Sequence, residues 1–115
     1  MANPDVVGAR RHMVRINVAK DFSEFPAGRF RTDGPYSGER FRDDVLAPAL
    51  RRAERIVVAL DGTMGYGSSF LEEAFGGLLR IGFNRSELKS KLSIECSDRS
   101  HEAEIWDYID PPPTE

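Results

Sequence analysis

The chain has 115 residues, of which 40% are hydrophobic and 30% charged, and its formal net charge is −3. This length supports a single domain, and the balance is that of a globular protein. A negative net charge disfavours general nucleic-acid binding, which requires a basic face. The sequence contains no apolar run of about 18 residues and no segment of signal-peptide type, so we expect no membrane span and a cytoplasmic location.

The single cysteine, Cys96, excludes an internal disulfide. Together with His12 and His101 it makes a poor metal site, because none of the three has a partner at ligand spacing. We therefore expect no metal and no cofactor.

Arginine supplies thirteen of the sixteen positive side chains. These arginines form either solvated faces or a surface for an acidic protein partner, which the planar guanidinium suits. They gather in two places, near the start of the chain and before a central apolar run: Arg10, Arg11, Arg15, Arg51, Arg52 and Arg55.

The first third of the chain predicts one strand and a long connection. Residues 1–12 are predicted to be a flexible N-terminus, residues 13–110 the domain and residues 111–115 a tail. The alternation in "MVRINV" (13–18) indicates a half-buried strand. Residues 22–38 are rich in Gly and Pro but carry aromatic side chains, and indicate an irregular connection with a short strand near 29–32.

The rest of the chain alternates helices with strands. Ser37 is placed to cap a helix that is kinked or broken at Pro48. The run "RIVVAL" (55–60) predicts a central strand covered on both faces. The next predicted element is a strongly amphipathic helix that ends near Gly82. After it we expect a short helix or turn, a strand near 92–97 and a helix over 100–109. This order predicts an α/β domain with about four strands in a mostly parallel or mixed sheet and helices packed on it.

The segment "LDGTMGYGSSFLEEAF" (60–75), a strand, a glycine-rich turn and a helix, matches no catalytic signature in full. Ser68 stands where a phosphate-binding loop has its lysine. Phe70 replaces the third glycine of a dinucleotide fingerprint, and Leu71 replaces the last glycine of a nucleophile elbow. "SFLE" instead predicts a capping box between Ser69 and Glu72.

A serine at this helix start has regulatory potential. The positive end of the helix dipole favours added negative charge. A phosphate on Ser69 would bring about −1.5 to −2 charges and would disturb an apolar or acidic docking surface.

These residues resemble the STAS domain of anti-sigma-factor antagonists, in which a strand ending in Asp is followed by paired serines and an apolar helix. "VVALDGTMGYGSSFLEEAFGGLL" and the upstream "SGERFRDDVLAPALRRA" resemble the STAS-like domain family of unknown function in particular. The resemblance implies no enzymatic activity and a role in signalling. It also implies partner switching with a histidine-kinase-like ATPase that phosphorylates a serine.

Carried over by position, Ser69 matches the phosphorylated serine, Ser68 its support and Asp61 the strand-end acid. Gly67 stands where the STAS motif of anti-sigma-factor antagonists has an aspartate, and this puts recognition by a kinase in doubt. Glu72 completes the supporting turn. The surface expected to bind a partner is formed by Met64, Tyr66, Phe70 and Glu73. Inward packing is an equally simple interpretation for Met64 and a less favoured one for Tyr66.

Three functions remain open from the sequence. The preferred one is a non-enzymatic regulatory module that binds an ATPase or a transcriptional regulator, without nucleic acid or membrane. The alternative is a small anion- or nucleotide-binding domain or enzyme, with a pocket between the Asp61–Ser69 turn and the 26–38 loop that includes Arg40 or Arg42. A third is self-association through the aromatic connection.

Overall fold

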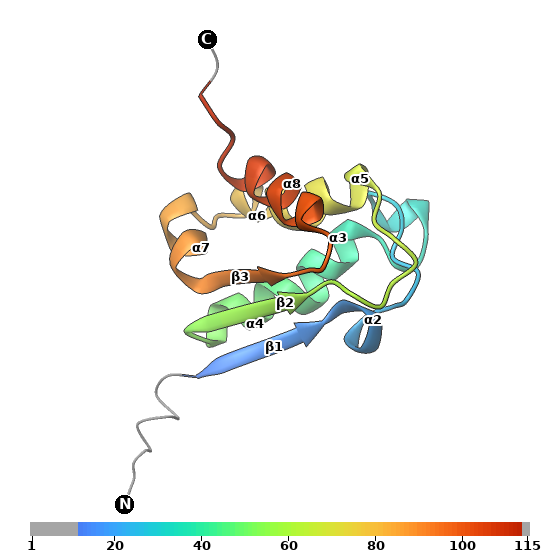
Figure 1. Ribbon diagram of the computed structural model, residues 1–115, viewed down its shortest axis with the longest axis horizontal. Coiled ribbons are helices and arrows are strands. Elements are labelled where there is room, and N and C mark those ends of the chain that lie inside the picture. The colour runs from blue at the N-terminus through green and yellow to red at the C-terminus, as the bar shows by residue number, and fades with distance from the viewer. Residues whose placement is uncertain (1–11, 114–115) are drawn as a thin grey trace, which may run out of the picture.

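The computed structural model describes residues 12–113; most of the predicted flexible N-terminus and the end of the predicted tail lie outside this range. Three strands, β1 (Met13–Asn17), β2 (Arg55–Ala59) and β3 (Leu92–Glu95), form one parallel sheet in the order β1-β2-β3 (Figure 1). The α/β class is confirmed. The expected number of strands is slightly too high, because the connection predicted to hold a short strand near 29–32 instead forms a 3₁₀ turn, η1 (Arg31–Asp33).

The sheet is covered on one face only. The strands lie in the sheet in their sequence order, and right-handed crossovers between such strands lie on the same side of the sheet. In Figure 1, α4 (Ala47–Arg52) lies behind the strands, and the other face of the sheet is toward the viewer. Residues toward the helices, such as Ile56, Val58 and Ile94, are buried. The expectation that β2 is covered on both faces is therefore wrong.

The open face is crossed by an ion pair between the two edge strands. Arg15 of β1 makes two hydrogen bonds to Glu95 of β3, with N–O distances of 2.9 and 2.6 Å. The pair must pass over β2, where Ala59 is buried and Val57 half-buried. The ion pair shields the apolar side chains of β2 on the open face, and so β2 has a continuous apolar run although no helix packs on that face.

The first crossover is one helix whose middle is widened. It consists of α3 (Gly38–Arg40), the π-helical η2 (Phe41–Leu46) and α4, and the Ser37 hydroxyl caps it by accepting from the Arg40 amide at 3.1 Å. The wide turns end just before Pro48, which has no N–H and whose ring crowds the carbonyl four residues earlier. The predicted irregularity at Pro48 thus takes the form of π-helical turns, and the helix continues through it.

The second crossover is built the same way from α5 (Ser68–Leu71), the π-helical η3 (Glu72–Gly76) and α6 (Gly77–Arg80). Gly82, with φ of 115°, follows its end as predicted. A short helix, α7 (Arg85–Lys91), leads into β3, and α8 (Arg99–Ile109), capped by Asp98, packs against η3.

The core lies between the sheet and these helices. At the carboxyl end of β1, the short helix α2 (Val18–Asp21) brings Phe22 against Phe41 and Tyr36, with ring centroids 5.2 and 5.6 Å apart. The aromatic connection is thereby anchored at the same end of the sheet as the glycine-rich turn. None of the helices described is long and apolar enough to cross a membrane.

Candidate functional site

The glycine-rich turn after β2 is held from inside by Tyr66. Gly62 and Gly65 have φ of 104° and 125°, a backbone region that favours glycine. Between Tyr66 and the end of the strand, the phenol donates to the Leu60 carbonyl at 2.7 Å. Its burial raises the pKa of Tyr66 to about 12, so the phenol stays protonated. Tyr66, one of the predicted partner-binding residues, is therefore half-buried and supports the turn.

The tip of the turn is apolar and meets the 22–38 connection. Met64 is 78% exposed and Phe25 is 64% exposed, more than any other large hydrophobic side chain of residues 12–113. The Met64 amide donates to the Glu24 carbonyl at 2.8 Å, which brings the two segments together. We call Met64 and Phe25 the apolar tip. Inward packing of Met64 does not occur.

The two serines lie in the first turn of α5, and both are exposed. The residue that precedes the helix is Gly67, and no side chain caps it. The predicted capping box of Ser69 and Glu72 is therefore wrong. Its physical reason is that the helix begins at Ser68, so Ser69 lies inside the first turn and is not the N-cap residue. The Glu72 carboxylate instead pairs with Arg29 and Arg80.

Two other residues predicted for partner binding lie inside the protein. Phe70 is 1% exposed and packs among the aromatic rings of the core. Glu73 is 7% exposed, and its carboxylate pairs with the Arg42 guanidinium, whose own side chain is buried to a similar degree. Neither is available as a contact unless the helix moves.

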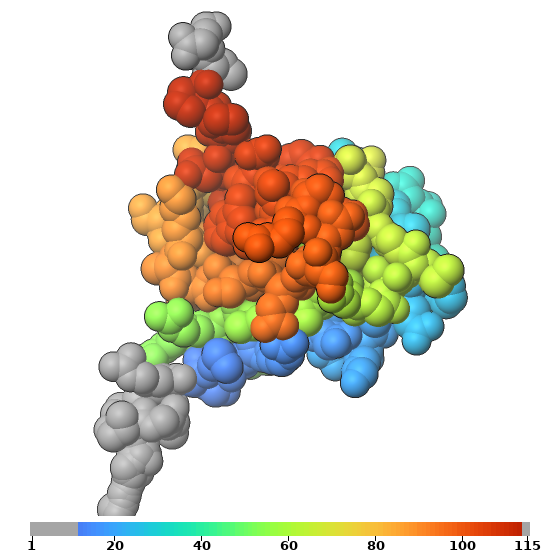
Figure 2. Space-filling view, viewed as in Figure 1, coloured from blue at the N-terminus to red at the C-terminus, as the bar shows by residue number. Residues whose placement is uncertain are grey.

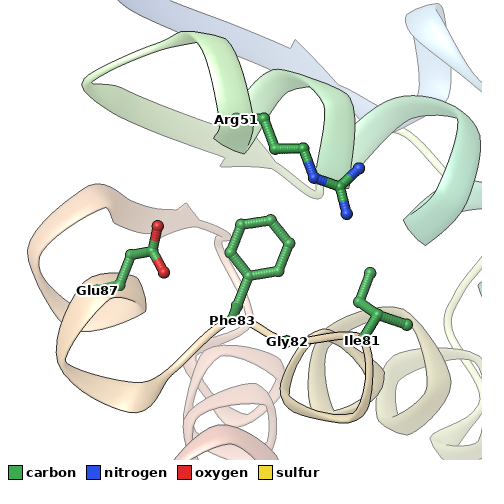
Figure 3. A pocket seen from close by; sticks show the side chains of 5 residues that line it. All are labelled: Arg51, Ile81, Gly82, Phe83 and Glu87. Carbon is green, nitrogen blue, oxygen red and sulfur yellow. The ribbon is translucent and has the colours of Figure 1, made fainter.

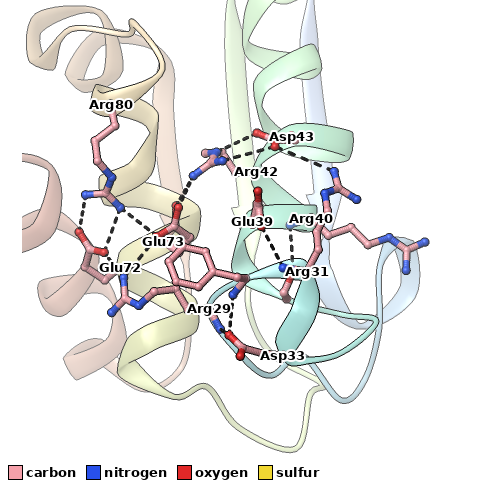
Figure 4. A network of polar contacts seen from close by, with 12 residues as sticks. Arg29, Arg31, Asp33, Glu39, Arg40, Arg42, Asp43, Glu72, Glu73 and Arg80 are labelled. Atoms are coloured by element: carbon pink, nitrogen blue, oxygen red, sulfur yellow. Dashed lines mark hydrogen bonds and ion pairs between the residues drawn. The ribbon is translucent and has the colours of Figure 1, made fainter.

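Figure 4 shows the network that uses these acids. Arg29 from the connection, Arg42 from η2 and Arg80 from α6 converge on Glu72 and Glu73. The hydrogen bonds from Arg80 and then Arg29 hold the pKa of the Glu72 carboxyl below its usual value. The network joins the 22–38 connection to both crossover helices, and so fixes the apolar tip relative to the serine pair.

The same network removes the proposed anion ligands from use. Burial works against the charge of Arg42, but hydrogen bonds to Asp43 and Glu73 outweigh it and raise its pKa. Arg40 lies over the Tyr36 ring, with its guanidinium carbon 5.4 Å from the ring centroid, and pairs with Asp44. Both arginines are engaged within the fold. Sequence reasoning missed Arg29, which carries no local signal because its partners are distant in the chain.

A small hollow of about 170 Å³ lies at the carboxyl ends of β2 and β3. Asp61 accepts from the Ser97 hydroxyl at 2.7 Å, and this bond lowers the pKa of Asp61. Asp61 therefore joins the start of the turn to the loop after β3. Because Asp61 and Asp98 are both carboxylates lining this hollow, its charge disfavours an anionic ligand.

The hollow also brings Cys96 next to His101, with Sγ 3.9 Å from Nδ1. The nearest carboxylate, Asp98, lies 3.9 Å from the same nitrogen. In a catalytic triad, the nucleophile and the carboxylate contact different nitrogens of the histidine ring, so these three groups do not form a triad. Burial raises the pKa of the Cys96 thiol, which keeps it protonated and a poor nucleophile. Among residues 12–113, no cluster of three or more His, Cys, Asp or Glu side chains is placed to hold a metal ion.

The described residues thus form a small parallel α/β domain with an ordered turn, an exposed serine pair and an apolar tip. Comparison with family models matches residues 37–100, more than half of the chain, to the STAS-like domain of unknown function (DUF4325). The chain belongs to this family of STAS-like domains. Searches of curated proteins and of solved structures returned no match.

Proposed function

We propose that this chain is a regulatory module that binds a protein partner, a histidine-kinase-like ATPase or a transcriptional regulator, through the apolar tip. The observation that carries the proposal is that the exposed residues Met64 and Phe25 lie on two segments that a backbone hydrogen bond joins. Single exposed hydrophobic side chains are common on protein surfaces. Here, the two most exposed ones come from separate segments and are held together by the Met64–Glu24 backbone hydrogen bond. Methionine and aromatic side chains are also enriched at interfaces.

The proposal includes a switch at Ser69. Its hydroxyl is on an exposed residue in the first turn of a helix, where the backbone dipole favours negative charge. A phosphate there would place about −1.5 to −2 charges beside a surface that binds through apolar contact, and would weaken that contact.

We further propose that the chain acts by binding and not by catalysis. The 3.9 Å separation of Cys96 from His101 and the raised pKa of the Cys96 thiol support this. The anion-binding alternative has less support, because two carboxylates line the hollow at the turn and Arg42 is paired within the fold.

The proposal is tested by capturing partners from the native host on immobilised protein and quantifying them by mass spectrometry. We expect Met64→Ser and Ser69→Glu each to lower capture of the ATPase or regulator by about tenfold, as the loss of a central contact does. Two matched controls should capture as the wild type does. Met13→Ser changes a methionine that is 58% exposed on the open sheet, and Ser86→Glu changes an exposed serine at the equivalent position of α7. Equal capture by all four variants would contradict the proposal.

A further inference from the structure

A second surface lies at the opposite end of the sheet from the apolar tip. It is formed where α4 ends and β2 begins, and where α6 turns into α7. A hollow of about 210 Å³ opens there, lined by side chains from these segments and by the backbone at Gly82 (Figure 3). Because it lies at the amino ends of the strands, it is separate from the site proposed above.

The positive charges at this end differ from the others in the molecule. Within residues 12–113, ten of the fourteen lysines and arginines form an ion pair with a carboxylate. The four that form none in this range are Lys20, Arg51, Arg52 and Arg55. Three of the four therefore gather within five residues of sequence, and all three are exposed.

Arg51 is the member of this group that faces the hollow. Figure 3 shows it reaching over Phe83, with its guanidinium carbon 5.4 Å from the ring centroid. The ring fixes the guanidinium plane and leaves its N–H donors available. A positive charge in the last turn of α4 also stabilises the helix dipole. Stabilisation of the helix dipole does not depend on the direction in which the side chain points, so it does not account for the placement of Arg51 over Phe83.

The walls of the hollow are mixed in character. Ile81 is 38% exposed and Phe83 forms the floor, while Glu87 lies on the far side and has Lys91 at 3.9 Å as its ion-pair partner. The volume is below the range of about 300–1,000 Å³ typical of small-molecule sites. It has room for a side chain rather than for a whole cofactor.

We propose that this end of the domain binds an acidic segment of a protein partner, with a carboxylate on Arg51 and an apolar side chain against Ile81 and Phe83. The Arg51 guanidinium, which forms no ion pair within residues 12–113, complements a carboxylate of such a segment. Glu87, which also lines the hollow, and the net charge of −3 disfavour a polyphosphate chain such as nucleic acid as the ligand.

The test uses the full chain and fluorescein-labelled peptides, with binding followed by fluorescence anisotropy and by NMR titration. We expect Glu-Glu-Leu-Glu-Glu to bind about tenfold more tightly than Gln-Gln-Leu-Gln-Gln, with the affinity falling as salt is added. The peptide Glu-Glu-Ser-Glu-Glu should bind about threefold more weakly than the leucine peptide, because the apolar contact is lost.

Variants locate the site. Arg51→Gln should lower the affinity for the glutamate peptide by about tenfold, and Arg51→Lys by about threefold, since lysine keeps the charge but not the fork. Lys20→Gln is the matched control, because Lys20 is the remaining cation without an ion pair within residues 12–113 and belongs to α2 at the other end of the sheet. It should change the affinity by less than about twofold. Thermal melting of each variant verifies that it is folded.

Four results would overturn the inference. They are equal binding of the glutamine peptide, an equal loss in Lys20→Gln, tighter binding of a DNA duplex than of the glutamate peptide, and Arg51-dependent self-association in light scattering. The last two would assign the surface to nucleic acid or to a second copy of the chain. None of them bears on Met64 or Ser69, so this inference and the proposed function fail separately.

Discussion

At the scale of single residues, the buried ion pair of Arg42 and Glu73 has the largest expected energetic consequence. Their side chains are 8% and 9% exposed, so the loss of either charge removes a close partner from a desolvated group. We expect Glu73→Gln to lower the free energy of unfolding by about 1–3 kcal/mol, because Arg42 loses its buried partner and keeps only its pair with Asp43.

The matched control for that variant is Asp44→Asn, which breaks an exposed pair with Arg31 at 46% and 48% exposure. Exposed pairs contribute about 0–1 kcal/mol. Urea denaturation of both variants measures the difference. If Glu73→Gln and Asp44→Asn lowered the free energy of unfolding by similar amounts, the Glu73 carboxylate would not be desolvated as its burial indicates.

At the scale of elements, the two crossover helices touch at Gly38. A Cβ built on this residue would lie 2.5 Å from the Phe70 carbonyl oxygen and 3.1 Å from the Glu73 Cβ. We expect Gly38→Ala to lower the free energy of unfolding by about 1–3 kcal/mol, since helix backbones must separate to admit the methyl group. Gly34→Ala, where a Cβ meets nothing within 4 Å, is the control.

Thermal and urea unfolding measure both glycine variants. Gly34→Ala should stay within about 0.5 kcal/mol of the wild type, as surface substitutions do. If Gly38→Ala is equally neutral, the close approach of α3 to α5 and η3 is not required for stability.

At the scale of the whole molecule, stability should depend on pH through its paired carboxylates. Hydrogen bonds from Arg80 lower the pKa of Glu72, and those from Arg31 and Ser97 lower the pKa of Asp44 and Asp61. A carboxyl whose folded pKa lies below its unfolded one contributes stability above the unfolded value. That contribution is lost as the pH falls through the folded pKa.

We therefore expect the urea midpoint to be level near neutral pH and to fall between about pH 5 and pH 2. Glu72→Gln should make this decrease smaller, because it removes the most buried of these three carboxylates. A midpoint that does not change across this range would contradict the paired state of these groups.

Much of the fold was predictable because its signals are local. The alternation in residues 13–18 and the apolar run at 55–60 correspond to β1 and β2, and the helix predicted over 100–109 is α8. The Ser37 cap and the stop at Gly82 depend on backbone geometry within a few residues, and both are confirmed. Where local patterns were ambiguous, they failed. The continuous apolar run at 55–60 indicated that β2 is covered on both faces, but the helices cover one face and the exposed Arg15–Glu95 ion pair crosses the other.

The candidate site was predictable only in part. The turn, its glycines and the exposed serines follow from the sequence between 60 and 69. The capping box failed because the helix begins at Ser68, before the predicted cap residue, and because Glu72 pairs with Arg29 and Arg80. The exposure of Met64 and the burial of Phe70 and Glu73 also depend on which face of the helix meets the core.

By itself, the sequence determined the α/β class, the family of STAS-like domains and the position of the turn, because periodicity and short motifs act over a few residues. The tertiary structure decided three further matters: which face of the sheet is open, that the turn at Met64 is joined to the connection at Glu24, and that Arg51 lies over Phe83. Each of these joins segments far apart in the chain, and such contacts are set by packing of the whole core rather than by local preference.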